Sequence, residues 1–249
     1  MKVTVCIKRV PSTATRLRIA ADGRSIDEAG VEQVLNPYDE FAVEEALRIV
    51  DRAGGEVTLV SFGPDAVTKE LRNGLAMGAH QAIHLPADAS FRDPLSIARA
   101  LAAAIGPTQP ELLLFGRQAV DGDHAQVGLM VATLLGMPAV PDVVKLELGP
   151  GSLKAWREVE GAIEAFELPL PCAVTAQKGL NEPRLPNMKG IMAAKKKTIS
   201  TQAPAAAAST LVLESLELPP ERSGGRIVGE GAAAVPALLK LLRDEARAL

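Results

Sequence analysis

Short apolar runs alternate with amphipathic stretches through the first half of this chain, and this alternation limits its fold more than any other feature. The apolar runs predict strands at residues 3–7, 56–62, 81–85 and 112–115. The stretches between them have apolar residues at helical spacing and predict helices over 37–53, 65–77, 94–105 and 124–135. Strands that alternate with helices are typical of a parallel sheet with right-handed crossovers. The sequence therefore predicts an α/β fold with a doubly wound, mostly parallel sheet.

The pattern changes after Gly136. Strand-like runs follow at residues 143–148, 153–159 and 162–168, and only short glycine-containing breaks separate them. Breaks of this length are typical of hairpins, so we expect antiparallel additions to the sheet. Residues 172–176 then predict one more buried strand.

The C-terminal part of the chain has a different composition. Residues 201–209 are rich in threonine, alanine and proline, a second break covers 219–231, and residues 235–249 predict an amphipathic helix. We therefore expect an α/β domain over residues 1–200, followed over 201–249 by a linker and an extended C-terminal arm that ends in a helix. The arm is expected to cover its own domain or a partner subunit.

Composition and charge exclude several classes of protein. A net charge of -3 and a pI near 5.7 argue against nucleic-acid binding, which needs a basic surface. Cys6 and Cys172 both lie in apolar runs, so we expect buried thiols and no disulfide or metal site. No apolar run is long enough to cross a bilayer, and Met1 leads directly into a strand without a targeting segment. These features predict a cytoplasmic protein without membrane insertion.

The strongest signal for a binding site is the glycine-containing stretch that runs from Gly116 to Gly128. It follows the apolar run 112–115 and leads into a predicted helix, the place where open α/β sheets bind ligands. Backbone amides at a helix start attract anions, and glycine lets the backbone approach a phosphate closely. The alternative is a polar turn whose aspartates cap the helix. We expect Asp121 to accept hydrogen bonds from amides of this loop and to hold its shape.

Other segments are expected to meet this loop. In a parallel sheet the carboxyl ends of the strands share one edge, which brings together the strand ends at Cys6, Phe62 and Gly116. Asn36 is expected to cap the helix that begins nearby, and Asp39 suits its positive end. Phosphate-binding amides beside an apolar slot predict a pocket for an adenine nucleotide.

A second functional element lies near residue 190. Leu180-Asn181-Glu182-Pro183-Arg184 leads into a proline-containing stretch over 185–190, and Lys195-Lys196-Lys197 follows. A local basic patch on an acidic protein suits the docking of specific partners. The alternative is a loop that runs into a solvated basic helix.

These motifs, in their order along the chain, resemble the electron transfer flavoprotein beta subunit family. The matching segments are 5–11, 35–46, 61–64, 74–79, the loop from Gly116 and the stretch 181–197. The resemblance covers Lys2 to about Thr198 and is weak beyond it. It implies an adenine nucleotide α-hydrolase-like fold without hydrolase chemistry.

The resemblance implies that the chain pairs with an alpha subunit, which carries most of the contacts to the redox FAD. In most members the beta subunit also binds AMP in a structural role, and in electron-bifurcating relatives the same site holds a second FAD. The implied nucleotide contacts are Cys6, Asn36, Pro37, Tyr38, Asp39, Phe62, Gly116, Arg117, Gln118, Ala119, Val120, Asp121, Gly122, Asp123, His124, Ala125, Gln126 and Val127.

Two features bear on which nucleotide is expected. Asp121-Gly122-Asp123 resembles the bifurcating version of the loop, whereas His124 and Leu129 depart from it. The intact motif over 180–197 resembles that of the ordinary type, which couples to dehydrogenases. AMP is therefore predicted, with FAD as the alternative.

The implied function is that of an electron carrier subunit without catalytic residues of its own. It would pass electrons from acyl-CoA and other flavin dehydrogenases, as in fatty acid oxidation, toward a quinone reductase of the respiratory chain. The resemblance makes Met188 the apolar anchor of docking, with Lys195, Lys196 and Lys197 as the charges beside it. The second hypothesis is a stand-alone nucleotide-binding or ATP-using protein, for which a lysine or serines at the helix start would be expected.

Overall fold

The computed structural model describes residues 1–88, 92–206, 208–220 and 224–249. They form two compact units, Met1–Leu216 and Glu217–Leu249. The second unit contains the 3-10 turn η3 (Ala232–Ala234) and helix α6 (Val235–Asp244). The first unit contains all the other helices and strands of the described residues.

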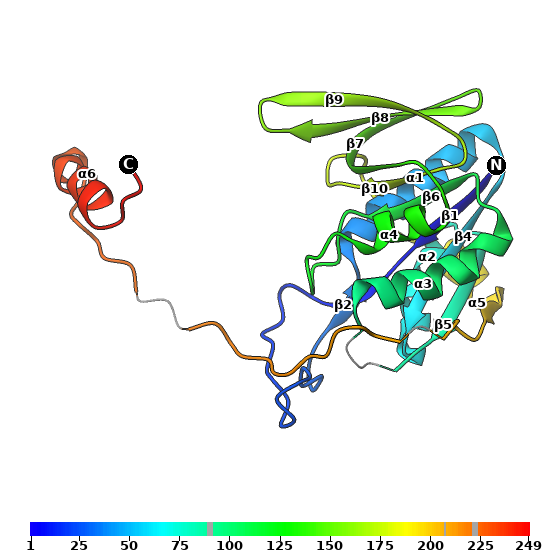
Figure 1. Ribbon diagram of the computed structural model, residues 1–249, viewed down its shortest axis with the longest axis horizontal. Coiled ribbons are helices and arrows are strands. Elements are labelled where there is room, and N and C mark those ends of the chain that lie inside the picture. Colours follow the sequence, from blue (N-terminus) through cyan, green and yellow to red (C-terminus); the bar gives the residue numbers. More distant parts are fainter. Residues whose placement is uncertain (89–91, 207, 221–223) are drawn as a thin grey trace. The chain divides into compact units, whose positions relative to one another are not determined.

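A mixed sheet forms the centre of the first unit (Figure 1). Its strands are β1 (Lys2–Cys6), β4 (Glu56–Gly63), β5 (Gln81–Pro86), β6 (Leu112–Gly116), β7 (Ala139–Gly149), β8 (Ser152–Val159), β9 (Ala162–Pro169), β10 (Cys172–Ala176) and β11 (Ile199–Thr201). In the described part of the chain their order is β11-β5-β4-β1-β6-β10-β7-β8-β9. The pairs from β11 to β7 are parallel, and β7–β8 and β8–β9 are antiparallel. The predicted α/β class, with a mostly parallel sheet and antiparallel additions, is confirmed.

Helices cover both faces of this sheet. They are α1 (Pro37–Ala53), α2 (Thr68–Met77), α3 (Pro94–Ile105), α4 (Val127–Leu134) and α5 (Met188–Lys196), with 3-10 turns η1 (Asp65–Val67) and η2 (Gly106–Thr108). One core lies under α1 and α2, where Leu47 and Leu71 pack against strand residues such as Leu59. The other lies under α3 and α4, where Leu101 and Val131 are buried. None of the described helices has both the length and the apolar character that a membrane crossing requires.

Some predicted boundaries differ from the structure. Helix α4 begins at Val127 and not at residue 124, because Asp123 and Ala125 have positive φ angles that a right-handed helix does not allow. Strand β7 begins at Ala139, four residues earlier than predicted, because it also pairs with β10. The short antiparallel pair β2 (Arg9–Pro11) and β3 (Gln33–Leu35) leads the chain from β1 to α1.

The chain after β10 crosses the face that carries α1 and α2. It runs from the middle of the sheet to α5, which packs on α2, and ends in β11 at the far edge. Helix α5 begins at Met188, inside the stretch predicted to be a loop, because the side chain of Asn187 accepts a hydrogen bond from the amide of Gly190 at 2.8 Å. Gly190 has no side chain, and a Cβ there would lie 2.3 Å from the carbonyl oxygen of Ala76. Glycine thus permits the close approach of α5 to α2.

Candidate functional site

The carboxylate of Asp39 joins the ends of β1 and β6. It accepts hydrogen bonds from the amide of Lys8 at 2.7 Å and from the amide of Gly116 at 3.1 Å. Gly116 approaches α1 so closely that a Cβ would lie 2.3 Å from Oδ1 of Asp39 and 2.7 Å from the backbone of Tyr38. Burial raises the pKa of Asp39 to about 7, although the hydrogen bonds from Asn36, Lys8 and Gly116 oppose that shift. The start of α1 is therefore fixed against two strand ends.

Asn36 has a different role from the predicted one. It precedes α1, but its side chain makes no capping hydrogen bond to that helix. Its Nδ2 donates to the carbonyl of Gln118 at 2.8 Å, and its Oδ1 accepts from the amide of Val120 at 3.2 Å. The residue is fully buried, so both polar atoms need partners, and the backbone of the loop after β6 supplies them. Asn36 therefore holds this loop against α1.

The loop 116–126 then turns on itself before α4. The carbonyl of Ala119 accepts hydrogen bonds from the amides of Gly122 and Asp123, and Nε2 of Gln118 donates to Oδ1 of Asp123 at 2.6 Å. Residues 121–126 are exposed, and two of them, Asp123 and Ala125, have a φ of 51°. Non-glycine residues in this region are strained, and such strain gathers at functional sites.

Helix α4 starts without a side-chain cap in the described part of the chain. The alternative reading of the loop, in which an aspartate caps this helix, is therefore wrong, because Asp123 bonds Gln118 and Asp121 bonds Lys8. The first amides of a helix have no partner within the helix and attract anions. The start of α4 thus lies open at an exposed loop that α1 holds in place.

Asp121 forms an ion pair that the sequence did not indicate. Its Oδ2 lies 2.7 Å from Nζ of Lys8. In the described part of the chain no loop amide donates to this carboxylate, contrary to the expectation. Lys8 follows β1, and the parallel order β1–β6 brings its amine to the loop after β6. Lys8 was visible in the sequence as a charged residue at a strand end, but no motif assigned it a role.

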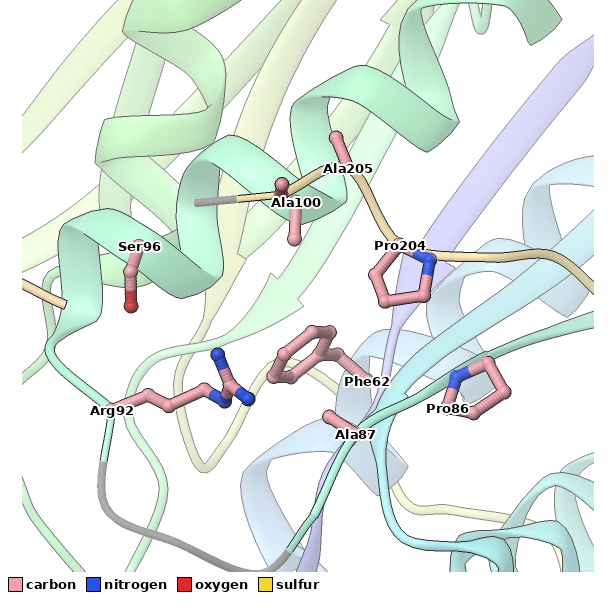
Figure 2. Close-up of a pocket in the computed structure, with 9 residues that line it drawn as sticks. Phe62, Pro86, Ala87, Arg92, Ser96, Ala100, Pro204 and Ala205 are labelled. Carbon is pink, nitrogen blue, oxygen red and sulfur yellow. The ribbon is translucent and has the colours of Figure 1, made fainter. Parts of the chain in front are cut away.

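Cys6 and Phe62 lie outside this hydrogen-bonded group. Cys6 is a buried free thiol, and burial, followed by the charge of Asp39, raises its pKa well above the ordinary value. Phe62 lines a pocket of about 180 Å³ near the start of α3 (Figure 2). The guanidinium carbon of Arg92 lies 5.7 Å from the centroid of the Phe62 ring. Among the described residues, no other predicted contact lines this pocket.

Further predicted contacts lie around the loop without joining its hydrogen bonds. Arg117 follows β6 and forms an ion pair with Asp142, with 3.0 Å between Nε and Oδ1. Pro37 and His124 are exposed. The ring of His124 lies next to Gly122, where a Cβ would be 3.6 Å from it.

The predicted docking segment, residues 180–197, presents a mixed apolar and basic surface. Met188 is 75% exposed, and Leu185, to which the sequence assigned no role, is 90% exposed. Met192 is also exposed, as are Lys195 and Lys196. Lys197 differs from its neighbours because its Nζ donates to the carbonyl of Ala79, which ties the end of α5 to the residues after α2.

Known proteins match the chain along its whole length. The family model of the electron transfer flavoprotein domain matches residues 24–207. The electron transfer flavoprotein subunit beta of Bacillus subtilis (strain 168) is 36% identical over 268 aligned residues, which cover 100% of both chains. The protein of the same name from Bradyrhizobium diazoefficiens is 37% identical over 100% of both chains, and that from Homo sapiens is 38% identical over 90% of this chain and 91% of its own. This chain belongs to the electron transfer flavoprotein family.

Proposed function

We propose that the chain is the beta subunit of a heterodimeric electron transfer flavoprotein, with AMP held at the loop 116–127. The observation that carries the nucleotide site is the clamp of Asn36 on Gln118 and Val120, together with the uncapped start of α4. The clamp fixes the loop, and the free helix start offers amides to a phosphate. Small residues such as Gly122 and Ala125 leave its backbone accessible.

The residues present suit the phosphate of a nucleotide. Lys8 places a positive charge beside the loop. Without a nucleotide, this charge is paired with the carboxylate of Asp121. The proposal assigns the contacts around the phosphate to residues 119–127 and to Lys8. Phe62 and Cys6 are assigned to the apolar side of the site, and Pro37, Tyr38 and Asp39 to its support.

The proposal makes the chain a carrier subunit and not an enzyme. The FAD of the heterodimer, mainly held by the alpha subunit, supplies the redox chemistry when it is bound. The described residues of this chain shape the nucleotide site and present Leu185 and Met188 to acyl-CoA and other flavin dehydrogenases. Electrons then pass toward a quinone reductase of the respiratory chain. The cytoplasmic location of the chain stays a prediction.

The arm over residues 201–249 is proposed to cover the alpha subunit. Val235, Leu238 and Leu239 have the spacing of one face of α6, and an apolar helical face is stabilised when a partner buries it. The nucleotide-binding domain is accordingly assigned to residues 1–200.

Mass analysis of the nucleotide released by denaturing the purified heterodimer tests this proposal. AMP is expected at about one molecule for each beta chain, beside the redox FAD, because each chain has one such loop. AMP added back to stripped protein should raise the melting temperature more than adenosine does, because only AMP carries the phosphate. A second FAD in place of AMP would show the bifurcating type. Release of neither, with no effect of added AMP, would show that the site assignment is wrong.

A further inference from the structure

The chain that leads to the docking segment has no regular structure to fix its course. In the part of the chain that the structure describes, residues 181–186 form no backbone-to-backbone hydrogen bond. This stretch nevertheless carries Leu185 and leads directly to Met188, the two most exposed apolar side chains of the segment. Its position therefore depends on side-chain contacts.

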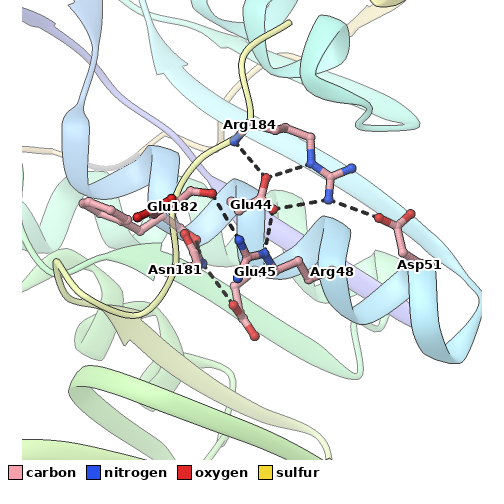
Figure 3. Close-up of polar contacts among 8 residues, drawn as sticks. Glu44, Glu45, Arg48, Asp51, Asn181, Glu182 and Arg184 are labelled. Carbon is pink, nitrogen blue, oxygen red and sulfur yellow. Dashed lines mark hydrogen bonds and ion pairs between the residues drawn. The ribbon is translucent and has the colours of Figure 1, made fainter.

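Helix α1 supplies these contacts through Glu44 and Asp51 (Figure 3). The carboxylate of Glu44 accepts hydrogen bonds from Arg184: from the backbone amide at 3.1 Å and from Nε at 2.8 Å, both to Oε2. A third bond joins NH2 of Arg184 to Oε1 of Glu44 at 3.3 Å, and NH2 also donates to Asp51 at 3.1 Å. Two carboxylates of one helix thus fix both the backbone and the guanidinium of the residue before Leu185.

Neighbouring residues fix the same stretch from its other end. Nε of Arg48 donates to Oε1 of Glu44 at 2.7 Å, and its NH2 donates to the carbonyl of Glu182 at 3.2 Å. Nδ2 of Asn181 donates to the carbonyl of Phe41 at 2.9 Å. The irregular stretch is therefore held along its length by a single helix.

Glu44 is charged although it is buried. Its side chain is 3% exposed, and burial alone would raise its pKa, but hydrogen bonds from Arg184 and Arg48 outweigh burial and lower the pKa below the ordinary value. A buried carboxylate needs such partners to stay ionised. The guanidinium of Arg184 is already engaged by two carboxylates, so it holds the segment and is not a free charge for a partner.

We propose that Arg184 is a positioning residue for docking, whose contacts with Glu44 and Asp51 hold Leu185 and Met188 where a flavin dehydrogenase meets them. This inference rests on the proposed docking function. A surface that is ordered before binding loses less conformational entropy on docking. Loss of the contact therefore weakens association and leaves the flavin chemistry of the docked complex unchanged.

The test uses the assembled heterodimer with Arg184→Gln, Glu44→Gln and the double variant. An acyl-CoA dehydrogenase reduced by its substrate serves as donor, and the rate of flavin reduction is measured against heterodimer concentration. Each single variant is expected to raise KM at least about tenfold with kcat within about twofold, which is the effect of a lost hot spot. The double variant should have a KM close to that of the more strongly affected single variant, because the Glu44–Arg184 contact is lost in all three. Hydrogen exchange at the amide of residue 184, which donates to the carboxylate of Glu44 at 3.1 Å, should become faster.

Two further variants control for general damage. Arg157→Gln removes another arginine–glutamate pair of the first unit, with 2.7 Å between Nε and Oε2 of Glu164, and should change neither KM nor exchange at the amide of residue 184. Arg184→Lys keeps the charge but not the planar fork, so an intermediate KM is expected. If Arg184→Gln does not fold, the KM of Arg184→Lys tests the positioning role of Arg184 in its place.

Failure of the inference and failure of the docking function give different results. If Met188→Ala or Leu185→Ala raises KM while Arg184→Gln or Arg184→Lys leaves it unchanged for each folded heterodimer, docking stands and the positioning role is wrong. If neither Met188→Ala nor Leu185→Ala changes KM, the docking function itself is wrong, and the inference falls with it.

Discussion

The amine of Lys8 and the carboxylate of Asp121 form an ion pair, with 2.7 Å between Nζ and Oδ2, that joins the end of β1 to the loop after β6. The side chains are 48% and 24% exposed, so water and salt screen the pair. Exposed ion pairs stabilise a fold by roughly 0–1 kcal/mol. The pair therefore matters more for the charge of the loop than for the stability of the fold.

Asp121→Asn is expected to change the free energy of unfolding by less than about 1 kcal/mol, because the pair is partly exposed. It should also tighten AMP binding to the stripped heterodimer, since it frees the amine of Lys8 and removes a negative charge near the proposed phosphate position. Calorimetric titration at low and high salt measures this gain, which should shrink as salt rises. Glu164→Gln on β9 is the matched control, because it also breaks a partly exposed ion pair, with Arg157, but lies outside the loop 116–127. Weaker AMP binding in Asp121→Asn would contradict the placement of the phosphate.

Gly116→Ala and Gly122→Ala are expected to separate folding from nucleotide binding. A Cβ at Gly116 would meet Asp39 and the backbone of Tyr38 below contact distance, so the variant should lose roughly 1–3 kcal/mol of stability. A Cβ at Gly122 would meet only the ring of His124, at 3.6 Å, and should leave stability unchanged. Gly122→Ala should instead weaken AMP binding, because the added methyl group crowds the exposed loop. Thermal melts with and without AMP measure both effects, and equal melting temperatures for the two variants would be the contrary result.

The buried carboxyl of Asp39 is expected to make stability depend on pH. Burial raises its pKa from 3.8 to about 7, so the folded protein binds this proton more tightly than the unfolded chain. Its contribution to stability is therefore largest at low pH and falls as the pH rises through about 7, by on the order of 4 kcal/mol in all.

Melting temperatures of Asp39→Asn and the unchanged protein, compared at about pH 5 and about pH 8, isolate this contribution. The unchanged protein should lose stability relative to the variant on going to the higher pH. A constant difference between Asp39→Asn and the unchanged protein would show that Asp39 ionises in the folded state as freely as in the unfolded one.

Leu185→Ala and Met188→Ala are each expected to weaken coupling to flavin dehydrogenases by about 1–2 kcal/mol, the scale of an exposed anchor that a partner buries. Stability should not change, because both side chains face solvent. Ile163→Ala on β9, which is 66% exposed, is the matched control and should leave coupling intact. If Met188→Ala instead lowered the melting temperature and kept full coupling for each folded molecule, Met188 would be a structural residue.

The three lysines at the end of α5 are expected to differ. Lys195→Gln with Lys196→Gln should slow association with the dehydrogenase at low salt and reduce its salt dependence, because exposed charges mainly steer encounter. Lys197→Gln should act on stability instead, because the amine of Lys197 donates to the carbonyl of Ala79. Stopped-flow rates at several salt concentrations, together with melting curves, distinguish the two effects. If Lys197→Gln changed the association rate as the double variant does and left the melting temperature unchanged, the structural role of the Lys197–Ala79 hydrogen bond would be wrong.

The sequence predicted the central strands and helices because each has a local signal. Asp93 illustrates this: Asp-Pro is a local signal for the start of a helix, and in the structure the side chain of Asp93 accepts a hydrogen bond from the amide of Ser96. Asn36 shows the limit of such reasoning. Asn-Pro gives the same local pattern whether the side chain caps its own helix or binds a loop that lies 82 residues away. Only the packing of β1 beside β6 decides between these roles.

The same limit applies to the docking segment. The sequence contains the basic run, and the family resemblance predicts Met188 as the apolar anchor. Neither indicates that Met188 opens a helix or that Lys197 bonds the backbone after α2. Arg184 and Glu44 are 140 residues apart, so no local pattern could have paired them. Contacts of this kind depend on how the chain crosses the sheet.

That crossing ties the segment to the fold on both sides. Strand β10 lies in the middle of the sheet and β11 at its edge, and the connection between them, residues 177–198, passes over α1 and α2. A protease that cut this connection at exposed Leu185 would therefore leave two fragments that both contribute strands to the same sheet. The shorter fragment would keep its hold through α5 against α2 and through β11 beside β5, so the nicked protein should stay whole until it is unfolded.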